Sequence, residues 1–382
     1  MPAGSSSGSG RHVNRARRLG TPKLLFLAFS MMAVPMSHPV LADTFAYVGN
    51  AGTNEVSVFR LDPASGDMAP VETATLAGVE KPGGSTPLAV APDKSWLVVG
   101  VRSEPYQAVS FAIDPKTGGL KQLGSGPLAD SMASIATDRS GRFLLSASYG
   151  GNKVAVNPIG ADGVVQPPSQ VVPTGPKAHL MIASPDNRHA LATNLGSDEV
   201  LSFAMDPKTG ALTPAASPSV KVAQGAGPRH FVFSPDGKFV YLLGELDGVV
   251  RVLAYDAGTG GLRELQHASA LPDGFTDKPW GADIHITPDG HFVYASERTS
   301  STIAGFAVDP ANGHLTRIGN APTEQQPRGF NIDPSGRYLA AVGELSNGMS
   351  VYAIDATSGK LTKLKSYPTG GKPNWVEFID FP

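Results

Sequence analysis

The sequence has no cysteine, few aromatic residues and no sustained helical periodicity. With Cys 0, no disulfide can support the fold, so core packing alone must stabilise it. Only 7% of residues are aromatic, whereas Gly 44 and Pro 33 indicate many turns. No window repeats its apolar residues with a 3.6-residue period, which argues against a helical bundle. These absences together predict an all-β protein.

Familiar catalytic and cofactor motifs are also missing. The only G-x-S-x-G lies at Gly4 to Gly8, near the N-terminus, so no nucleophile elbow is expected. The chain has no phosphate-binding loop, dinucleotide fingerprint or calcium loop. His285 and His291 flank a predicted turn and diverge, which is unsuitable for zinc. We therefore expect no cofactor and no metal site.

The first 42 residues read as an export signal. Leu24 to Met36 form a short apolar segment, and Val40-Leu41-Ala42 offers a cleavage site before Asp43. The apolar segment is too short to span a bilayer. The basic residues that precede or begin it are Arg11, Arg15, Arg17, Arg18 and Lys23. We predict a signal peptide with a low-complexity leader over 1–42, and a periplasmic protein without a membrane anchor after cleavage.

The charge of the remaining chain disfavours nucleic acid as a partner. The whole chain carries a formal net charge of −2, and residues 1–42 hold five positive charges and no acid. Residues 43–382 therefore carry −2 − 5 = −7. A strongly acidic chain is repelled by phosphate backbones.

A turn of the form Asp-Pro-x-Thr-Gly recurs along the chain. We find six copies and a degraded seventh at Asn157-Pro158-Ile159-Gly160. Seven repeated units of this size suggest a repeat architecture. The six better copies lie at 62–66, 114–118, 206–210, 256–260, 309–313 and 355–359.

A second turn, Pro-Asp-Gly or a variant, sets the period. Its second residues are separated by 46 to 53 residues, which suits four short strands per unit. Six such hairpins accompany seven Asp-Pro turns, so the seventh unit lacks its first strand, and residues 374–379 can supply it next to residues 45–48. We predict a seven-bladed β-propeller over 43–382, closed by the C-terminal strand. The second residues are Asp93, Ser140, Asp186, Asp236, Asp289 and Ser335.

Aligning the repeats predicts which residues meet at one mouth of the central channel. Where the innermost strand begins, the repeats carry Thr86, Ala133, His179, Arg229, Ala282 and Arg328. Just past the end of the second strand, they carry Arg102, Tyr149, Leu195, Glu245, Arg298 and Glu344. Antiparallel strands bring both sets to one rim.

This rim would gather arginines around two carboxylates, an arrangement that suits an anionic or oxygen-rich ligand. The plain alternative is a set of structural ion pairs. We assign Arg328, Arg102 and Glu344 to substrate binding. His230, next to Arg229, faces a neighbouring blade and is either a further substrate-binding residue or a buried histidine with satisfied hydrogen bonds.

Three motifs carry a resemblance to a known family. They are Gly227-Pro228-Arg229-His230-Phe231 with Gly244-Glu245-Leu246, Tyr294-Ala295-Ser296-Glu297-Arg298, and Gln326-Pro327-Arg328-Gly329-Phe330. Over residues 44–382 the chain resembles the seven-bladed lactonase propellers, which include propeller-type 6-phosphogluconolactonases and carboxymuconate-cyclising enzymes. The resemblance implies catalytic roles for His179, Arg229, Arg298 and Glu245. Gly244 and Glu297 stand where that family usually has asparagine.

The activity that the resemblance implies is metal-free hydrolysis of a sugar lactone. Glu245 would act as general base or acid, the arginines would stabilise the oxyanion, and His179 would orient substrate or share proton transfer. Export favours an unphosphorylated aldonolactone over a phosphorylated one. Two alternatives remain: a lactonising cycloisomerase acting on an unsaturated dicarboxylate, and a non-catalytic binding module.

Overall fold

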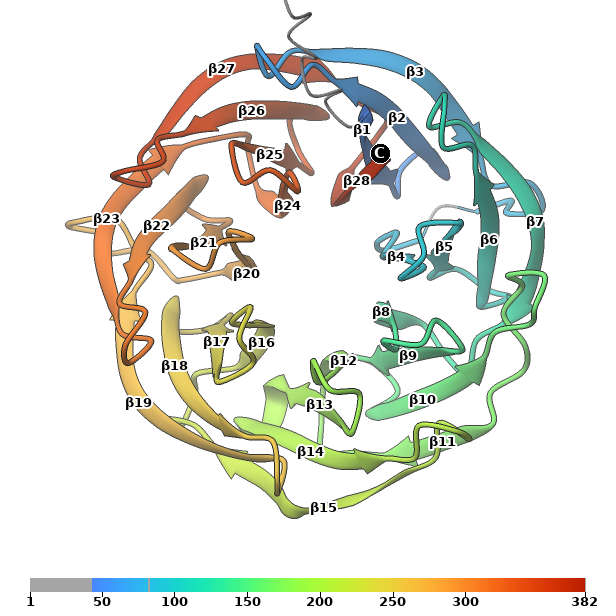
Figure 1. The fold of residues 1–382 in the computed structure, drawn as a ribbon, viewed down its shortest axis with the longest axis horizontal. Coiled ribbons are helices and arrows are strands. Elements are labelled where there is room, and N and C mark those ends of the chain that lie inside the picture. The colour runs from blue at the N-terminus through green and yellow to red at the C-terminus, as the bar shows by residue number, and fades with distance from the viewer. Residues whose placement is uncertain (1–42, 82, 382) are drawn as a thin grey trace, which may run out of the picture. The chain divides into compact units, whose positions relative to one another are not determined.

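The protein is described by a computed structural model that covers residues 43–81 and 83–381. In this part of the chain, seven antiparallel four-stranded sheets are arranged as blades around a central channel (Figure 1). The predicted seven-bladed propeller is therefore confirmed. The predicted signal peptide, 1–42, lies outside the described residues.

Each blade runs outward from a strand that lines the channel, and we number the blades in chain order (Figure 1). Blade 1 holds β28 (Pro373–Phe381), β1 (Asp43–Asn50), β2 (Glu55–Leu61) and β3 (Met68–Thr75). Blade 2 holds β4 (Leu88–Val90), β5 (Trp96–Val101), β6 (Gln107–Ile113) and β7 (Leu120–Pro127). Blade 3 holds β8 (Met132–Thr137), β9 (Phe143–Ser148), β10 (Lys153–Pro158) and β11 (Gln170–Pro173). Blade 4 holds β12 (Ala178–Ala183), β13 (His189–Asn194), β14 (Glu199–Met205) and β15 (Leu212–Lys221).

The remaining blades repeat this order. Blade 5 holds β16 (Pro228–Phe233), β17 (Phe239–Gly244), β18 (Val249–Asp256) and β19 (Gly261–Ser269). Blade 6 holds β20 (Gly281–Ile286), β21 (Phe292–Glu297), β22 (Thr302–Val308) and β23 (Leu315–Pro322). Blade 7 holds β24 (Pro327–Ile332), β25 (Tyr338–Gly343), β26 (Gly348–Ile354) and β27 (Leu361–Pro368).

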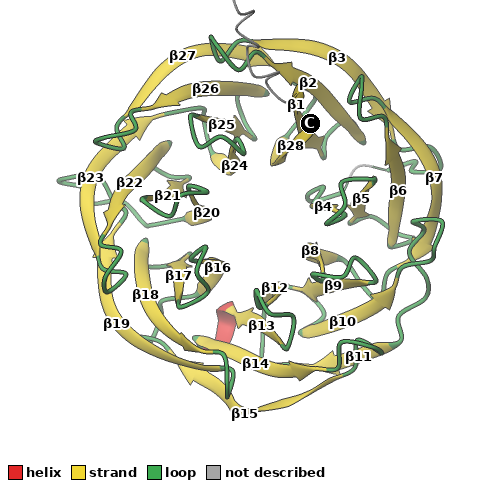
Figure 2. Ribbon diagram, in the orientation of Figure 1, coloured by secondary structure: helices red, strands yellow, loops and turns green. Residues whose placement is uncertain are grey.

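In residues 43–81 and 83–381, helical structure is confined to one short turn. Figure 2 shows strands and loops throughout, with the 3₁₀ turn Leu195–Ser197 as the helical element of the described residues. Within that same part of the chain, no helix has the length and apolar character needed to cross a membrane.

The ring closes through the predicted shared blade. β28 pairs antiparallel with β1, from Asp43 opposite Phe381 to Gly49 opposite Trp375. The first blade therefore takes its innermost strand from the end of the chain. Closure of this kind leaves no blade with an unpaired inner strand, which protects the sheet edges without any disulfide.

The recurring Asp-Pro turn has a packing role between blades. The glycine of each turn packs against a side-chain ring of the preceding blade, at the start of that blade's second strand. Gly313, for example, packs against the ring of Phe239. A Cβ on Gly313 would lie 2.7 Å from that ring, and its φ of +75° also favours glycine. Proceeding around the ring, the pairs are Phe45–Gly118, Trp96–Gly163, Phe143–Gly210, His189–Gly260, Phe239–Gly313, Phe292–Gly359 and Tyr338–Gly66.

The seventh outer turn begins three residues later than the predicted copy at Asn157. Asn157 and Pro158 still belong to β10, and Asn157 is buried, its side-chain amide donating to the backbone oxygens of Pro127 and Gln166. The turn instead begins at Gly160, whose amide bonds the Val164 carbonyl, and Gly163 packs against Trp96. A longer loop joins β10 to β11 than joins the matching strands of other blades, so the position of the motif does not mark the turn in this blade.

Hydrophobic clusters fill the spaces between neighbouring blades. The cluster between blades 5 and 6 includes Tyr241, Leu243, Val252, Ile284 and Phe306. The Tyr241 hydroxyl donates to the Gly313 carbonyl at 3.1 Å, which satisfies a polar group in this apolar layer. Tyr47 and Tyr294 make the same bond to Gly118 and Gly359.

A β-bulge recurs in the inner strand where it meets the mouth. In β16 the pairing jumps from Pro228 opposite Gly244 to His230 opposite Leu243, which leaves Arg229 as the extra residue. Bulges re-aim side chains and are common beside functional sites. The same irregularity occurs in β8, β12, β20 and β24, so the residue predicted to line the mouth lies within the bulge each time: Ala133, His179, Arg229, Ala282 and Arg328.

Candidate functional site at the channel mouth

Two arginines from adjacent blades hold one carboxylate. Arg229 Nε donates to Glu245 Oε2 at 2.9 Å, and Arg298 Nη2 donates to the same oxygen at 2.8 Å. The side chains of Arg229, Glu245 and Arg298 are only 2%, 12% and 5% exposed. We call these three residues the mouth cluster. Its members come from β16, from the residue after β17 and from the residue after β21.

Electrostatics keep Glu245 ionised. Burial raises the pKa of Glu245, but Arg229 and Arg298 outweigh this effect, and the pKa lies below its ordinary value. Burial also lowers the pKa of Arg298 to about 9, and the nearby Arg229 adds to the shift. The cluster therefore concentrates charge in a dehydrated place, where ionic interactions are stronger than in water.

The cluster keeps hydrogen-bonding capacity for a ligand. Arg229 Nη1 bonds the Ala282 carbonyl, and Arg298 bonds the carbonyls of Trp280 and Gly281. Among the described residues, no hydrogen bond engages Arg229 Nη2, Arg298 Nη1 or Glu245 Oε1. Two donor nitrogens and one acceptor oxygen thus remain for a substrate and a water molecule.

The two departures from the family pattern support this geometry. Glu297 is fully buried, and its Oε1 accepts the Trp280 backbone amide at 2.7 Å, which fixes the segment beside Arg298. The Arg298 guanidinium lies 3.9 Å from the Trp280 ring centroid, a cation–π distance. At Gly244, a Cβ would lie 2.7 Å from the Ala226 carbonyl oxygen, so a larger residue would force the backbone there to shift.

His179 lies at the same mouth but lacks a partner that would orient its ring. It is 4% exposed, and Nδ1 is buried without a hydrogen bond to any described residue. Burial, followed by Arg229, holds the pKa of His179 well below its ordinary value, so the imidazole is neutral at pH 7. Its ring packs edge-on against Tyr149, with centroids 6.0 Å apart.

The other predicted rim residues form a second group. Arg328 Nη1 donates to Glu344 Oε1 at 2.9 Å and to the Gly84 carbonyl at 3.0 Å. Arg102 donates to the hydroxyls of Ser85 and Ser131. Burial, then Arg328 and Arg229, lower the pKa of Arg102 to about 10. The charges of this second group therefore interact with those of the mouth cluster. The structure thus brings the seven predicted charged or histidine rim residues to one region. They are Arg102, His179, Arg229, Glu245, Arg298, Arg328 and Glu344.

His230 faces the neighbouring blade, as predicted, but its hydrogen bonds are only half satisfied. Nδ1 lies 2.8 Å from Asp283 Oδ1, whereas Nε2 is buried without a partner among the described residues. Asp283 also lies 3.3 Å from His285 Nε2. Among the described residues, one ring nitrogen of His230 is therefore bonded and the other has no protein partner.

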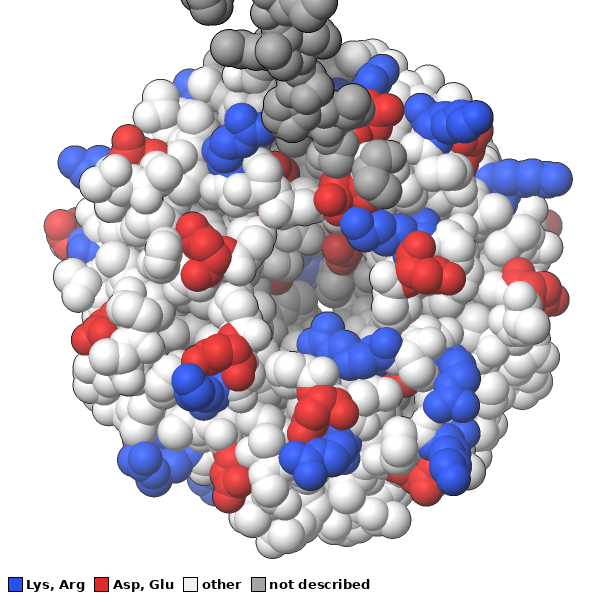
Figure 3. Space-filling model, in the orientation of Figure 1, with Lys and Arg blue, Asp and Glu red and all other residues white. Residues whose placement is uncertain are grey.

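Sequence reasoning missed a polar cluster deeper in the channel. A cavity there is lined by Asp283, His285, Asn331, Trp375 and Glu377 as well as His230. Burial raises the pKa of Glu377 to about 7. Figure 3 shows one face of the ring hollowed at its centre. The sequence did contain a sign of this cluster: Asp283 and His285 are two residues apart in β20, so their side chains point to the same face of the strand.

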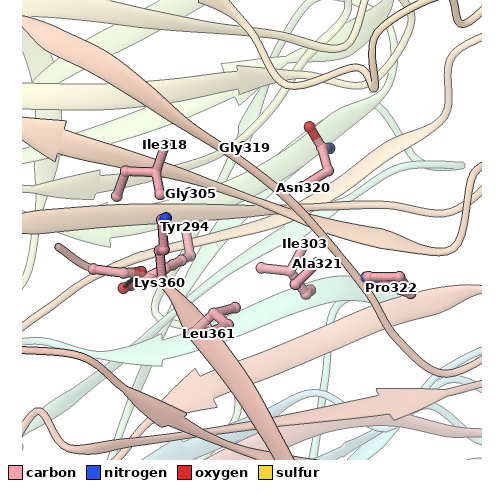
Figure 4. A pocket seen from close by; sticks show the side chains of 11 residues that line it. Tyr294, Ile303, Gly305, Ile318, Gly319, Asn320, Ala321, Pro322, Lys360 and Leu361 are labelled. Carbon is pink, nitrogen blue, oxygen red and sulfur yellow. Dashed lines mark hydrogen bonds between the residues drawn. The ribbon is translucent and has the colours of Figure 1, made fainter.

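A separate hollow between blades 6 and 7 is a poor candidate for a site. Figure 4 shows its lining, which includes Tyr294, Ile303, Ile318, Asn320 and Lys360. The Tyr294 hydroxyl already donates to the Gly359 carbonyl, and no convergent group of charges lines the hollow. Within residues 43–81 and 83–381, no group of three or more His, Asp or Glu side chains is arranged to hold a metal ion.

The family model for lactonases with a seven-bladed β-propeller matches residues 45–378. The chain therefore belongs to the seven-bladed β-propeller lactonase family. It is 40% identical over 286 residues to a 6-phosphogluconolactonase of Pectobacterium carotovorum, covering 75% of this chain and 83% of that one. It is 43% identical over 257 residues to a 6-phosphogluconolactonase of Erwinia tasmaniensis, covering 67% and 76%. A solved structure, a periplasmic gluconolactonase of Pseudomonas aeruginosa, superposes with a TM-score of 0.81 at 31% identity, covering 89% and 100%.

Proposed function

We propose that this protein is an exported lactonase that hydrolyses an unphosphorylated aldonolactone to the open-chain acid without a metal ion. The observation that carries the proposal is the mouth cluster, in which two buried guanidinium groups flank one ionised carboxylate. Family membership and the names of the relatives support lactone hydrolysis. The similar periplasmic gluconolactonase and the N-terminal sequence support export and an unphosphorylated substrate.

The cluster suits the charge that develops during lactone opening. Attack of water on the carbonyl carbon places negative charge on the carbonyl oxygen, and the free guanidinium nitrogens of Arg229 and Arg298 would stabilise it. Glu245, ionised at neutral pH, cannot donate a proton to the leaving ring oxygen. Its role is to align both arginines and to accept a hydrogen bond from water through Oε1. His179 would orient the sugar hydroxyl groups.

The test is a titration of released acid. The purified full-length protein, treated with chelator, is mixed with glucono-1,5-lactone in a pH-stat, and spontaneous hydrolysis is subtracted. We expect acceleration by the wild type and its loss in Glu245→Gln. Inhibition by the chelator would refute the metal-free mechanism, and recovery of the protein from the cytosol alone would refute export.

A phosphorylated lactone is the second candidate, and the charge at the mouth favours it. The mouth holds four guanidinium groups, those of Arg102, Arg229, Arg298 and Arg328, against the carboxylates of Glu245 and Glu344, a surplus of 4 − 2 = 2 positive charges. Such a surplus would hold a phosphate. Comparing kcat/KM for the two lactones decides between them. Failure of both, and of muconate-type acids, would favour the binding module.

A further inference from the structure

The mouth cluster lacks an evident group to take the proton from the attacking water. Glu245 Oε2 is already bonded by Arg229 and Arg298, so this carboxylate serves to align the two guanidinium groups. No described residue hydrogen-bonds His179 Nδ1, and the imidazolium that His179 would form faces Arg229, Arg298 and Arg328. An efficient base would need an opposite charge beside it.

His230 has that arrangement. Its Nδ1 lies 2.8 Å from Asp283 Oδ1, and the carboxylate can only accept, so Nδ1 carries the hydrogen. The other nitrogen, Nε2, is then an acceptor, and it is buried without a partner among the described residues. A carboxylate behind a histidine whose second nitrogen is free is the general arrangement of an activated base.

Position also favours His230. Arg229 and His230 are consecutive in β16, yet both reach β20, where Arg229 bonds the Ala282 carbonyl and His230 bonds Asp283. In a regular strand, consecutive side chains point to opposite faces, and the bulge at Arg229 allows this exception. The base therefore lies directly beside an arginine of the mouth cluster, and its ring also lines the channel cavity.

We propose that His230 is the general base for lactone hydrolysis and that Asp283 is the residue that positions it. This inference rests on the proposed lactonase function. His230 Nε2 removes a proton as the water oxygen bonds to the lactone carbonyl carbon, whose oxygen becomes the oxyanion beside the arginines. The oxyanion collapses, the bond from the carbonyl carbon to the ring oxygen breaks, and the ring oxygen takes the proton from Nε2. The new carboxylic acid then releases its own proton to water.

The surroundings of His230 predict its pH behaviour. Burial and then Arg229 lower the pKa of His230 to about 4, whereas Asp283 raises it and His285 opposes that gain. His179 from β12 and Trp375 from β28 also pack against the ring, and Glu377 lies in the same cavity. The imidazole is neutral near pH 7, so kcat/KM is expected to be flat near neutrality and to fall below about pH 4.

The first experiment is rescue of a truncated base. In the full-length protein, His230→Ala should lower kcat for glucono-1,5-lactone by about 100-fold or more, and added imidazole, entering through the channel cavity, should restore at least about a tenth of it. Glu245→Gln should gain nothing from imidazole. His230→Ala with near wild-type kcat, or a folded His230→Ala that imidazole does not rescue, would overturn the proposal.

The second experiment tests Asp283 and does not depend on the first variant folding. Asp283→Asn removes the charge that raises the pKa of His230, so kcat should fall by about 10-fold or more and the acid limb of kcat/KM should move to lower pH. Asp289→Asn makes the same substitution at an exposed carboxylate in the turn between β20 and β21 and is the matched control, with kcat within about threefold of wild type. An unmoved acid limb in Asp283→Asn would overturn the proposal. If the wild type accelerates no lactone, the proposed function itself has failed.

Discussion

Blades 3 and 5 have a similar backbone at the mouth but carry different side chains there. β8 and β16 both begin with a bulge, and both pair with a second strand of six residues. Blade 5 places Arg229 and Glu245 at the two mouth positions, where blade 3 has Ala133 and Tyr149. The geometry of the mouth is thus a property of the repeat, and its function depends on a few side chains that the repeat carries.

The largest expected effect comes from removing the carboxylate charge at the mouth of blade 5. Glu245→Gln removes the charge that aligns Arg229 and Arg298, so kcat for glucono-1,5-lactone should fall by about 100-fold or more. Tyr149→Phe in blade 3, which keeps its ring beside His179, should change kcat less than threefold. Both are measured by pH-stat. Similar losses in the two variants would contradict the functional difference between the blades.

Arg298→Lys should have the next largest effect. Lysine keeps the positive charge but loses the planar fork, which bonds Glu245 and the Gly281 carbonyl, and the stacking on Trp280. We expect kcat to fall about 10- to 100-fold, with a folded protein by circular dichroism. Full activity would mean that charge alone suffices at this position.

The contacts between blades should respond alike in both regions. Gly210→Ala and Gly313→Ala each place a methyl group within 2.6–2.7 Å of a ring, Phe143 or Phe239, at a φ of +74° or +75°. Each should lower the free energy of unfolding by about 1–3 kcal/mol in urea titrations. Neither should alter kcat at 25 °C. A selective loss of activity in Gly313→Ala would show that this contact and the mouth are coupled.

Glu377 in the channel predicts a pH-dependent stability. Its pKa of about 7 lies above the ordinary value of 4.5, so between these values the folded protein keeps a proton that the unfolded chain has lost. That stabilisation is complete below pH 4.5 and is lost as the pH rises through 7. Urea unfolding of Glu377→Gln at pH 5 and pH 8 should show a smaller fall than the wild type. An equal fall would contradict the assignment.

The smallest effect is expected from converting one blade 5 contact to its blade 3 form. Tyr241 donates to the Gly313 carbonyl, and the matching position in β9 is Leu145, which has no hydroxyl. Tyr241→Phe should lower the free energy of unfolding by about 1 kcal/mol and leave kcat unchanged. No loss in urea titration would show that the hydroxyl is dispensable there.

The repeat made most of the fold predictable. The spacing of the Pro-Asp turns indicated blades, and the missing inner strand indicated closure by residues 374–379, which β28 confirms. The same alignment anticipated that Arg229, Glu245 and Arg298 would meet. Such predictions succeed because a repeat fixes equivalent positions in every unit.

The features that could not be predicted from the sequence are irregular or depend on long-range contacts. The bulge at Arg229 is an unpaired residue that no turn motif signals. The bond between His230 and Asp283 joins residues 53 apart in different blades, so only the closed ring brings them together. The pKa of Glu377 depends on its burial, which local sequence does not reveal.

The seven glycine–ring contacts have a consequence for how this family can change over time. No residue of those pairs is among the mouth residues, since the pairs join the start of each second strand to an outer turn. Substitutions at the mouth can therefore accumulate without weakening the junctions that hold the blades together. A lineage can exchange one substrate for another on an inherited ring, one blade at a time.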